Sequence, residues 1–290
     1  MMDVDCEYLI DRPLQIGESP VWDEQRQCLW FVDILAPEIL CFDWATRRLA
    51  VYAMPSAVGS IGLTSQGGLV VALRSGVYLF DPDSAALRFL VQPEPDRPMN
   101  RLNDGKVGPD GCFWIGSIHD ASPRQPTAAL YRVTPEGKSV LILDGLKASN
   151  GLAWSPDGGV LYHADTRGPY IAGYRFDPDT GALSDRRLLR ECDEATGLPD
   201  GAAVDADGNY WSAGVSAGCL NRLSPEGQLL ESLRLPVAAP TMPCFGGPDL
   251  RTVFVTSLAK ATANGTQPGT LISFRVETPG LLAPRFHTLA

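Results

Sequence analysis

Short apolar segments separated by turn residues follow one another along the whole chain, and no long helical periodicity interrupts them. Near the N-terminus four such segments occur in succession, at Ser19–Trp22, Cys28–Asp33, Ile39–Asp43 and Leu49–Met54. The same plan returns at Lys106–Val107, Cys112–Ile118, Ala129–Val133 and Ser139–Leu143. Apolar runs bounded by Gly, Pro and Asp predict strands joined by tight turns. The pattern therefore predicts an all-β chain built from sets of four strands.

This four-strand unit recurs six times. Its copies begin at Glu18, Ser60, Asn103, Asn150, Asp200 and Pro243, so successive starts lie 42 to 50 residues apart. A repeat of this length is typical of a propeller blade. Because blades close into one body, we predict a single domain over residues 1–290, a six-bladed β-propeller of four-stranded blades.

The sixth copy predicts how the ring closes. It has clear strands at Thr252–Ser257 and Thr270–Val276, but its fourth strand is weak. An unpaired sheet edge invites aggregation, so another segment should cover it. The strand-like segment Cys6–Ile10 precedes the first copy. We expect this N-terminal strand to complete the sixth blade and join the two ends of the chain.

Four of the six copies begin with a side chain that carries an amide or carboxylate oxygen, namely Glu18, Asn103, Asn150 and Asp200. Equivalent positions of a propeller form a ring at one end of its channel, and oxygen ligands suit a hard divalent cation. Taken singly, Asn150-Gly151 and Asp200-Gly201 are equally typical of hairpin turns. Their shared phase with Glu18 favours a site for one divalent ion, Ca²⁺, Zn²⁺, Mn²⁺ or Fe²⁺. Ser60 and Pro243 would leave space for a ligand.

A second polar cluster lies at residues 101–106. Arg101 and Asn103 alternate with Leu102, so on an extended chain they face the same side. They are candidates for a clamp on a polyhydroxylated ligand, although Arg101 could also be a solvated strand end. Asp104 could bind the ligand or shape the loop. His119 and Asp120 end the next predicted strand of this blade and could border the same pocket.

Charge and composition exclude several classes of function. The net charge of −10 argues against a nucleic-acid partner, and no apolar run approaches the roughly 20 residues that cross a membrane. The seven cysteines contain no C-x-x-C pair and no secretory signal is visible, which favours reduced thiols in the cytoplasm. The zincin, serine-elbow and phosphate-loop motifs are missing, so a metal-centred hydrolase remains.

Six motifs occur in one order along nearly the whole chain: GESPVW (17–22), FVDI (31–34), RLNDGK (101–106), SNGLAW (149–154), LPDG (198–201) and PCFGGPDL (243–250). Together they resemble the senescence marker protein/gluconolactonase family, also called regucalcin-like. The resemblance implies a metal held by Glu18, Asn150 and Asp200, with Asp200 as general base. It also implies substrate contacts from Arg101 and Asn103.

Residues 119–121 read His-Asp-Ala, whereas vertebrate members of that family place substrate-contacting acidic residues there. The chain is in this respect more similar to bacterial sugar-acid lactonases, so His119 and Asp120 are candidate contacts and Ala121 is not. The expected activity is metal-dependent hydrolysis of an aldonolactone, such as a glucono-, galactono-, xylono- or arabinonolactone, to the aldonic acid. The alternatives are a calcium-binding regulatory scaffold and a promiscuous esterase or organophosphate hydrolase at the same metal.

Overall fold

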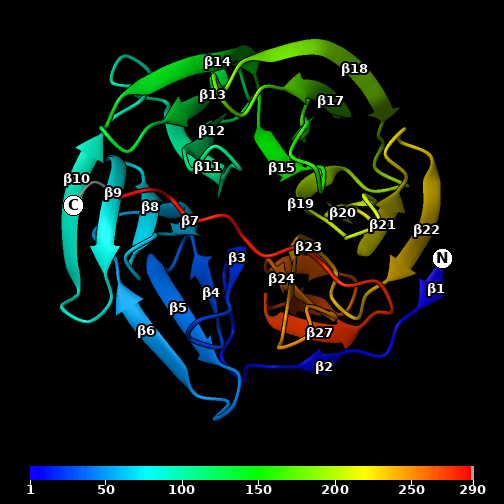
Figure 1. The fold of residues 1–290 in the computed structure, drawn as a ribbon. Coiled ribbons are helices and arrows are strands. Elements are labelled where there is room, and N and C mark those ends of the chain that lie inside the picture. The colour runs from blue at the N-terminus through cyan, green and yellow to red at the C-terminus, as the bar shows by residue number, and fades with distance from the viewer. Residues whose placement is uncertain (289–290) are drawn as a thin grey trace.

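A computed structural model describes residues 1–288, which form strands and turns without a helix. Six antiparallel four-stranded sheets are arranged as blades around a central channel, and one of them carries an additional strand (Figure 1). The predicted six-bladed β-propeller is therefore confirmed. No helix in the described residues is long and apolar enough to span a membrane.

The strands of each blade follow one another outward from the channel. The innermost strands are β3 (Gly17–Asp23), β7 (Val58–Leu63), β11 (Asn100–Val107), β15 (Ser149–Trp154), β19 (Pro199–Val204) and β23 (Pro240–Gly246). The second strands are β4 (Cys28–Asp33), β8 (Leu69–Leu73), β12 (Phe113–His119), β16 (Val160–Asp165), β20 (Tyr210–Gly214) and β24 (Thr252–Ser257).

The third strands are β5 (Glu38–Asp43), β9 (Gly76–Asp81), β13 (Ala128–Val133), β17 (Tyr170–Phe176), β21 (Cys219–Leu223) and β27 (Leu271–Arg275). The outer strands are β6 (Leu49–Ala53), β10 (Ala86–Val91), β14 (Ser139–Leu146), β18 (Leu183–Glu191), β22 (Leu229–Arg234) and, in the sixth blade, β2 (Glu7–Tyr8). A short hairpin, β25 (Lys260–Thr262) and β26 (Gly265–Gln267), stands apart from the blades.

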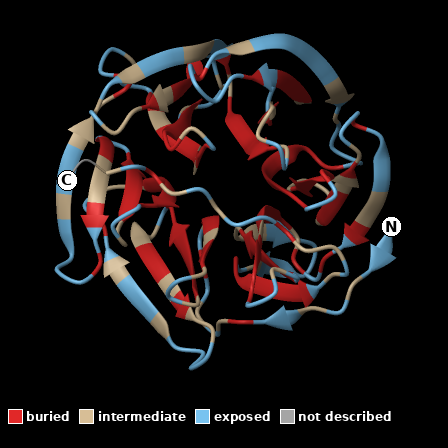
Figure 2. Ribbon diagram, viewed as in Figure 1, coloured by how far each residue is buried: buried red, intermediate tan, exposed pale blue. Residues whose placement is uncertain are grey.

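Burial falls from the inner strands to the outer ones (Figure 2). The second strands are almost entirely buried, whereas the outer strands expose much of their length. Apolar side chains of neighbouring blades pack against each other, as where Trp22 of blade one stacks on Phe254 of blade six with ring centroids 5.7 Å apart. Burial of such apolar area is the main stabilising term of the fold.

The N-terminal segment closes the ring as the sequence predicts. Strand β2 pairs antiparallel with β27, with Glu7 opposite Ser273 and Tyr8 opposite Ile272. A further strand, β1 (Met2–Asp3), pairs in parallel with β22 of the fifth blade. The N-terminus thus covers the outer edges of two blades, of which the sequence predicted only one.

Each innermost strand contains a β-bulge near its start, where the pairing register shifts. A bulge redirects side chains, and here it turns one residue per blade toward the channel end. Gly151 sits in the bulge of β15 with φ +65°, and a Cβ there would lie 2.4 Å from the Tyr210 Oη atom. Asn150-Gly151 and Asp200-Gly201 therefore belong to strands, and their interpretation as hairpin turns is wrong.

The hairpins that follow the inner strands show which residue occupies the ring position in each blade, and in two blades it is not the predicted one. In the four blades with a polar ring residue, that residue lies five positions before the first residue of the hairpin that follows its strand. Glu18 and Asp23 are one such pair, and Asn150 and Ser155 are another. The same interval back from Thr64 and Gly247 reaches Gly59 and Met242. These residues, rather than the predicted Ser60 and Pro243, occupy the ring positions of blades two and six. Neither carries a side-chain oxygen.

The C-terminal segment, residues 277–288, crosses the channel at the end that carries these inner hairpins (Figure 1). It forms isolated bridges from Gly280 to Asp205 and from Phe286 to Thr64. Arg285 adds an ion pair to Asp23 at 2.9 Å. Because Glu18 and its equivalents lie at the start of the inner strands, this segment covers the end of the channel opposite to the predicted ring.

Candidate metal centre

The structure brings the predicted ring residues together at one end of the channel. Glu18, Asn103, Asn150 and Asp200 come from four different blades and are each at most 8% exposed. The Nδ2 atom of Asn103 donates hydrogen bonds to Asn150 Oδ1 and to the Ser149 carbonyl, both at 3.0 Å. These side chains are therefore buried polar groups that face one another across blade boundaries.

The amide of Asn150 has a fixed orientation. Its Nδ2 atom donates to Thr166 Oγ1 at 2.6 Å, and Thr166 Oγ1 donates its own proton to the Pro199 carbonyl at 2.7 Å. Because that hydroxyl proton is already used, Thr166 can only accept from Asn150. The Asn150 oxygen is thus turned to the side of Asn103, where a lone pair remains free for a cation.

The carboxyl groups of this region have raised pKa values because they are buried close to one another. Burial raises the pKa of Asp200 to about 8, with a further rise from Asp104 that Arg167 and Arg101 oppose. Burial also raises the pKa of Glu18 well above its usual value, and Asp200 and Asp104 add to this rise. Desolvation and like charges both disfavour the ionised forms, and a bound cation would reverse that balance.

Asp104 lies among these groups and joins two blades. Its Oδ2 atom accepts a hydrogen bond from the Leu152 amide at 3.1 Å, whereas its buried Oδ1 atom has no partner. Burial raises the pKa of Asp104, and the nearby Lys106 ammonium lowers it. One oxygen of Asp104 therefore fixes the bulge of β15, and the other is available in the channel.

The donor set fits a hard divalent ion. It offers carboxylate and amide oxygens with no sulfur or imidazole donor among Glu18, Asn150 and Asp200, and the unpartnered Asp104 oxygen lies close by. These three include only two carboxylates, and no group of three His, Cys, Asp or Glu residues arranged to hold an ion is found in residues 1–288. Any site here would therefore depend on the Asn150 amide.

Arg101 and Asn103 face the same side, as predicted. The Nη1 atom of Arg101 donates to Asn103 Oδ1 at 2.8 Å, and its Nε atom donates to Asp120 Oδ1 at 3.3 Å. The Arg101 side chain is 11% exposed, so it is not a solvated strand end. The two side chains form one hydrogen-bonded unit beside the ring, with Asp120 as the counter-ion of the guanidinium.

His119 and Asp120 lie at the same end of blade three. His119 ends β12 opposite Asn100, is 8% exposed, and has a buried Nδ1 atom without a partner. Asp120 also pairs with Arg74 at 2.8 Å. Asp120 is therefore already shared between two arginines, whereas the imidazole of His119 keeps an unused hydrogen-bonding atom.

Sequence reasoning missed several residues of this end of the channel: Arg74, Arg124, Thr166 and Arg167. Thr166 and Arg167 lie in the turn that follows β16, and Arg124 lies in the loop that follows β12. The sequence signal that could have identified them was their position directly after second strands of the blades, whose ends flank the ring.

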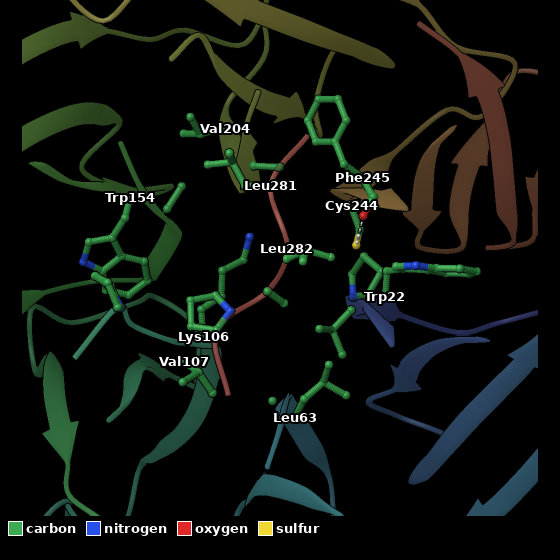
Figure 3. A pocket seen from close by; sticks show the side chains of 18 of the residues that line it. Trp22, Leu63, Lys106, Val107, Trp154, Val204, Cys244, Phe245, Leu281 and Leu282 are labelled. Atoms are coloured by element: carbon green, nitrogen blue, oxygen red, sulfur yellow. Dashed lines mark hydrogen bonds between the residues drawn. The ribbon is translucent and has the colours of Figure 1, made fainter. Parts of the chain in front are cut away.

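The opposite end of the channel holds a cavity of about 430 Å³ (Figure 3). Its walls are mainly apolar, with Trp22, Trp154 and Phe245 from the blades and Leu281 and Leu282 from the C-terminal segment. Lys106 extends into it and donates to the Ala202 carbonyl. None of the ring residues Glu18, Asn103, Asn150 and Asp200 lines this cavity.

Comparisons with known proteins identify the family of the chain. The model of the "SMP-30/Gluconolactonase/LRE-like region" family matches residues 16–259. A 6-deoxy-6-sulfogluconolactonase of Pseudomonas putida is 38% identical and covers 98% of this chain and 99% of its own. Regucalcin of Xenopus laevis is 33% identical and covers 89% and 88%, respectively.

The solved structure of a calcium-binding protein, regucalcin, from Agrobacterium tumefaciens superimposes with a TM-score of 0.92 at 26% identity. It covers 98% of both chains. The family model, the relatives and the similar structure all indicate the family that the sequence motifs resemble. The chain belongs to the SMP-30/gluconolactonase/LRE-like family.

Proposed function

We propose that this chain hydrolyses a sugar lactone to the corresponding aldonic acid, with one divalent metal ion at the ring. The carrying observation is the locked Asn150 amide, whose oxygen faces a region containing two buried carboxyl groups of raised pKa. Relatives named as lactonases support the activity at the level of the family.

In this proposal Glu18, Asn150 and Asp200 hold the ion. When bound, the ion would supply Lewis-acid polarisation of the lactone carbonyl and a lowered pKa for a water molecule. Asp200 would accept the proton of the attacking water as general base. The bound cation would favour the ionised form of Asp200, which is the form that can accept a proton.

Arg101 and Asn103 would orient the sugar. Their mutual hydrogen bond and the Asp120 counter-ion fix the guanidinium before substrate binds, which reduces the entropy lost on binding. His119 Nδ1 offers a further hydrogen bond to a sugar hydroxyl. Arg101 is 11% exposed and Asn103 and His119 are each 8% exposed, so their contacts are stronger than they would be on the surface.

A lactone panel tests the proposal. Glucono-, galactono-, xylono- and arabinonolactone would be offered to metal-stripped protein and to protein restored separately with Ca²⁺, Zn²⁺, Mn²⁺ and Fe²⁺. The expected result is saturable hydrolysis of at least one lactone by a restored form and none by the stripped form. Equal activity of stripped and restored protein would overturn the metal dependence.

A calcium-binding regulatory protein is the second candidate, because relatives and a similar structure carry the name regucalcin. Metal binding without turnover of any lactone would favour it. The Arg101–Asn103 unit beside the ring argues for the enzyme, since an ion site alone needs no such clamp. Turnover of phenyl esters or organophosphates in preference to lactones would instead favour a promiscuous hydrolase.

A further inference from the structure

Four arginines reach the ring end of the channel from three neighbouring blades. Arg74 follows β8, Arg101 lies in β11, Arg124 lies in the loop after β12, and Arg167 lies in the turn after β16. Thr166, which orients the Asn150 amide, immediately precedes Arg167 in that turn. The arginines therefore border the mouth of the candidate metal centre.

Asp120, which lies at this mouth, forms ion pairs with only two of these arginines. Asp120 pairs with Arg74 at 2.8 Å and with Arg101 at 3.3 Å. Arg124 instead donates to the main-chain carbonyl of His119. Within residues 1–288, neither Arg124 nor Arg167 forms an ion pair with a carboxylate.

Asp165 shares the turn with Arg167 but does not serve as its partner. Its carboxylate accepts hydrogen bonds from four main-chain amides, those of Lys147, Ala148, Arg167 and Gly168. These bonds shape the turn: Oδ1 accepts three of them, and Oδ2 accepts the one from Lys147. The guanidinium of Arg167 is thus left without an acidic neighbour in direct contact.

The loops that carry Arg124 and Arg167 converge on Lys147 and Ala148, because the His119 amide donates to the Lys147 carbonyl at 3.4 Å and the Thr166 amide donates to the Ala148 carbonyl at 3.1 Å. Burial lowers the pKa of Arg124, the charge of Arg167 lowers it further, and the nearby Asp120 carboxylate opposes both effects. Arg167 acts at the same time on Asp200, whose pKa it lowers. Two like charges close together cost free energy, and they occur here in a chain with a net charge of −10. An anionic ligand would offset that cost.

We propose that Arg124 and Arg167 form a subsite for an anionic substituent on the substrate, so that the preferred lactone carries a sulfonate, phosphate or carboxylate group away from its ester. A guanidinium presents a planar fork of donors that matches such groups in two-point contacts. Arg101 and Asn103 lie on the innermost strand β11, whereas Arg124 and Arg167 lie in loops that follow the second strands β12 and β16, so in this proposal they would meet a different part of the substrate. This inference rests on the proposed lactonase function for its choice of substrate.

A kinetic comparison gives the first test. Gluconolactone with a hydroxyl at C6 would be compared with derivatives carrying a phosphate, a sulfonate or a carboxylate there. We expect at least one anionic lactone to exceed the neutral one in kcat/KM by about 10- to 100-fold, and the excess to shrink as salt is added. The three anionic arms identify the group that fits best. Equal kcat/KM for all four substrates would overturn the proposal.

The variants Arg124→Met and Arg167→Met locate the effect. Each should reduce the ratio of kcat/KM for the anionic lactone to kcat/KM for neutral gluconolactone by about tenfold or more. Arg124→Met should change hydrolysis of neutral gluconolactone by less than about threefold, whereas Arg167→Met is judged by the ratio alone because Arg167 also acts on Asp200. Arg187→Met is the matched control, because Arg187 is an exposed arginine on the outer strand β18. A loss equal in the control and the two variants would assign the effect to overall charge and remove the subsite.

Binding of unreactive ring analogues separates this inference from the lactonase proposal. Titration calorimetry would compare 1,5-anhydroglucitol with its 6-phosphate and 6-sulfonate, none of which contains a lactone. Tighter binding of an anionic analogue by the native chain, and loss of that difference in Arg167→Met, would support the subsite even if no lactone is hydrolysed. Lactone hydrolysis with no anion preference in either assay would overturn the subsite alone.

Discussion

The two ends of the channel are built by the same six strands, yet their chemistry is opposite. At the ring end the inner strands carry Glu18, Asn103, Asn150 and Asp200. Four residues further along the same strands lie Trp22, Val107, Trp154 and Val204, which line the apolar cavity. A single repeat thus places polar side chains at one end of the channel and apolar side chains at the other.

The difference between the two ends shows which positions of the inner strands serve the site and which serve packing. The bulge in each inner strand separates the two sets of positions and turns the ring residues toward one another. The apolar set varies in size from Val to Trp, as expected of positions that only fill space. The ring set instead has a polar residue where a blade contributes to the site and Gly59 or Met242 where it does not.

Asp200→Asn should break the ring end most severely. The amide retains an oxygen that can reach the ion, but it cannot accept a proton, so kcat should fall by about 10²- to 10⁴-fold. Metal content should fall less, because only one negative charge is lost. Asn150→Asp is the control, since it adds charge and should bind metal at least as well. Near-normal turnover by metal-loaded Asp200→Asn would remove Asp200 as the base.

Arg101→Ala should have the next largest effect. It removes the guanidinium that contacts Asn103 and Asp120, and we expect kcat/KM to fall by roughly 10- to 100-fold, mainly through KM. Metal affinity should stay close to that of the native chain, because Arg101 is not among the proposed ligands. A comparable loss of bound metal, measured on the same preparation, would contradict its role as a clamp.

Thr166→Val tests the orientation of the Asn150 amide. The variant keeps the shape of the side chain but removes the hydroxyl that accepts from Asn150 Nδ2. Loss of a group that orients a metal ligand typically costs about 10-fold or more in affinity, and we expect the low end of that range. Thr46→Val, in an exposed turn of blade one, is the control. Unchanged metal affinity in Thr166→Val would show that the amide needs no such lock.

Much of the fold could be predicted because it follows from local patterns. Hairpin punctuation and apolar alternation located the blades, and the weak last strand indicated that Cys6–Ile10 would close the ring. The repeat phase went wrong at Ser60 and Pro243 because Gly59 and Met242 carry no polar side chain that would mark the ring position in the sequence, and only the hairpins that follow these strands reveal it. Thr166, Arg124 and Arg167 were missed because their importance arises from loops of different blades meeting in space. The C-terminal segment was missed because it pairs through isolated bridges and carries no strand pattern.

Val204→Ala should have the smallest effect on activity and so sharpen the contrast with Asp200 on the same strand. The truncation removes buried apolar volume, which should lower the free energy of unfolding by roughly 1–3 kcal/mol. Turnover by the folded protein should change by less than about twofold, because a packing position touches no reacting group. A large loss of kcat at full metal content would show that the two ends of the channel are coupled.

Anomalous diffraction from crystals grown with Mn²⁺ tests the central claim most directly. The account predicts one strong peak at the ring end, within about 2.0–2.5 Å of oxygens from Glu18, Asn150 and Asp200. The cavity beside Lys106 should show none. A peak at another place, or none at the ring in a protein whose lactonase activity depends on Mn²⁺, would contradict the assignment of this end as the metal centre.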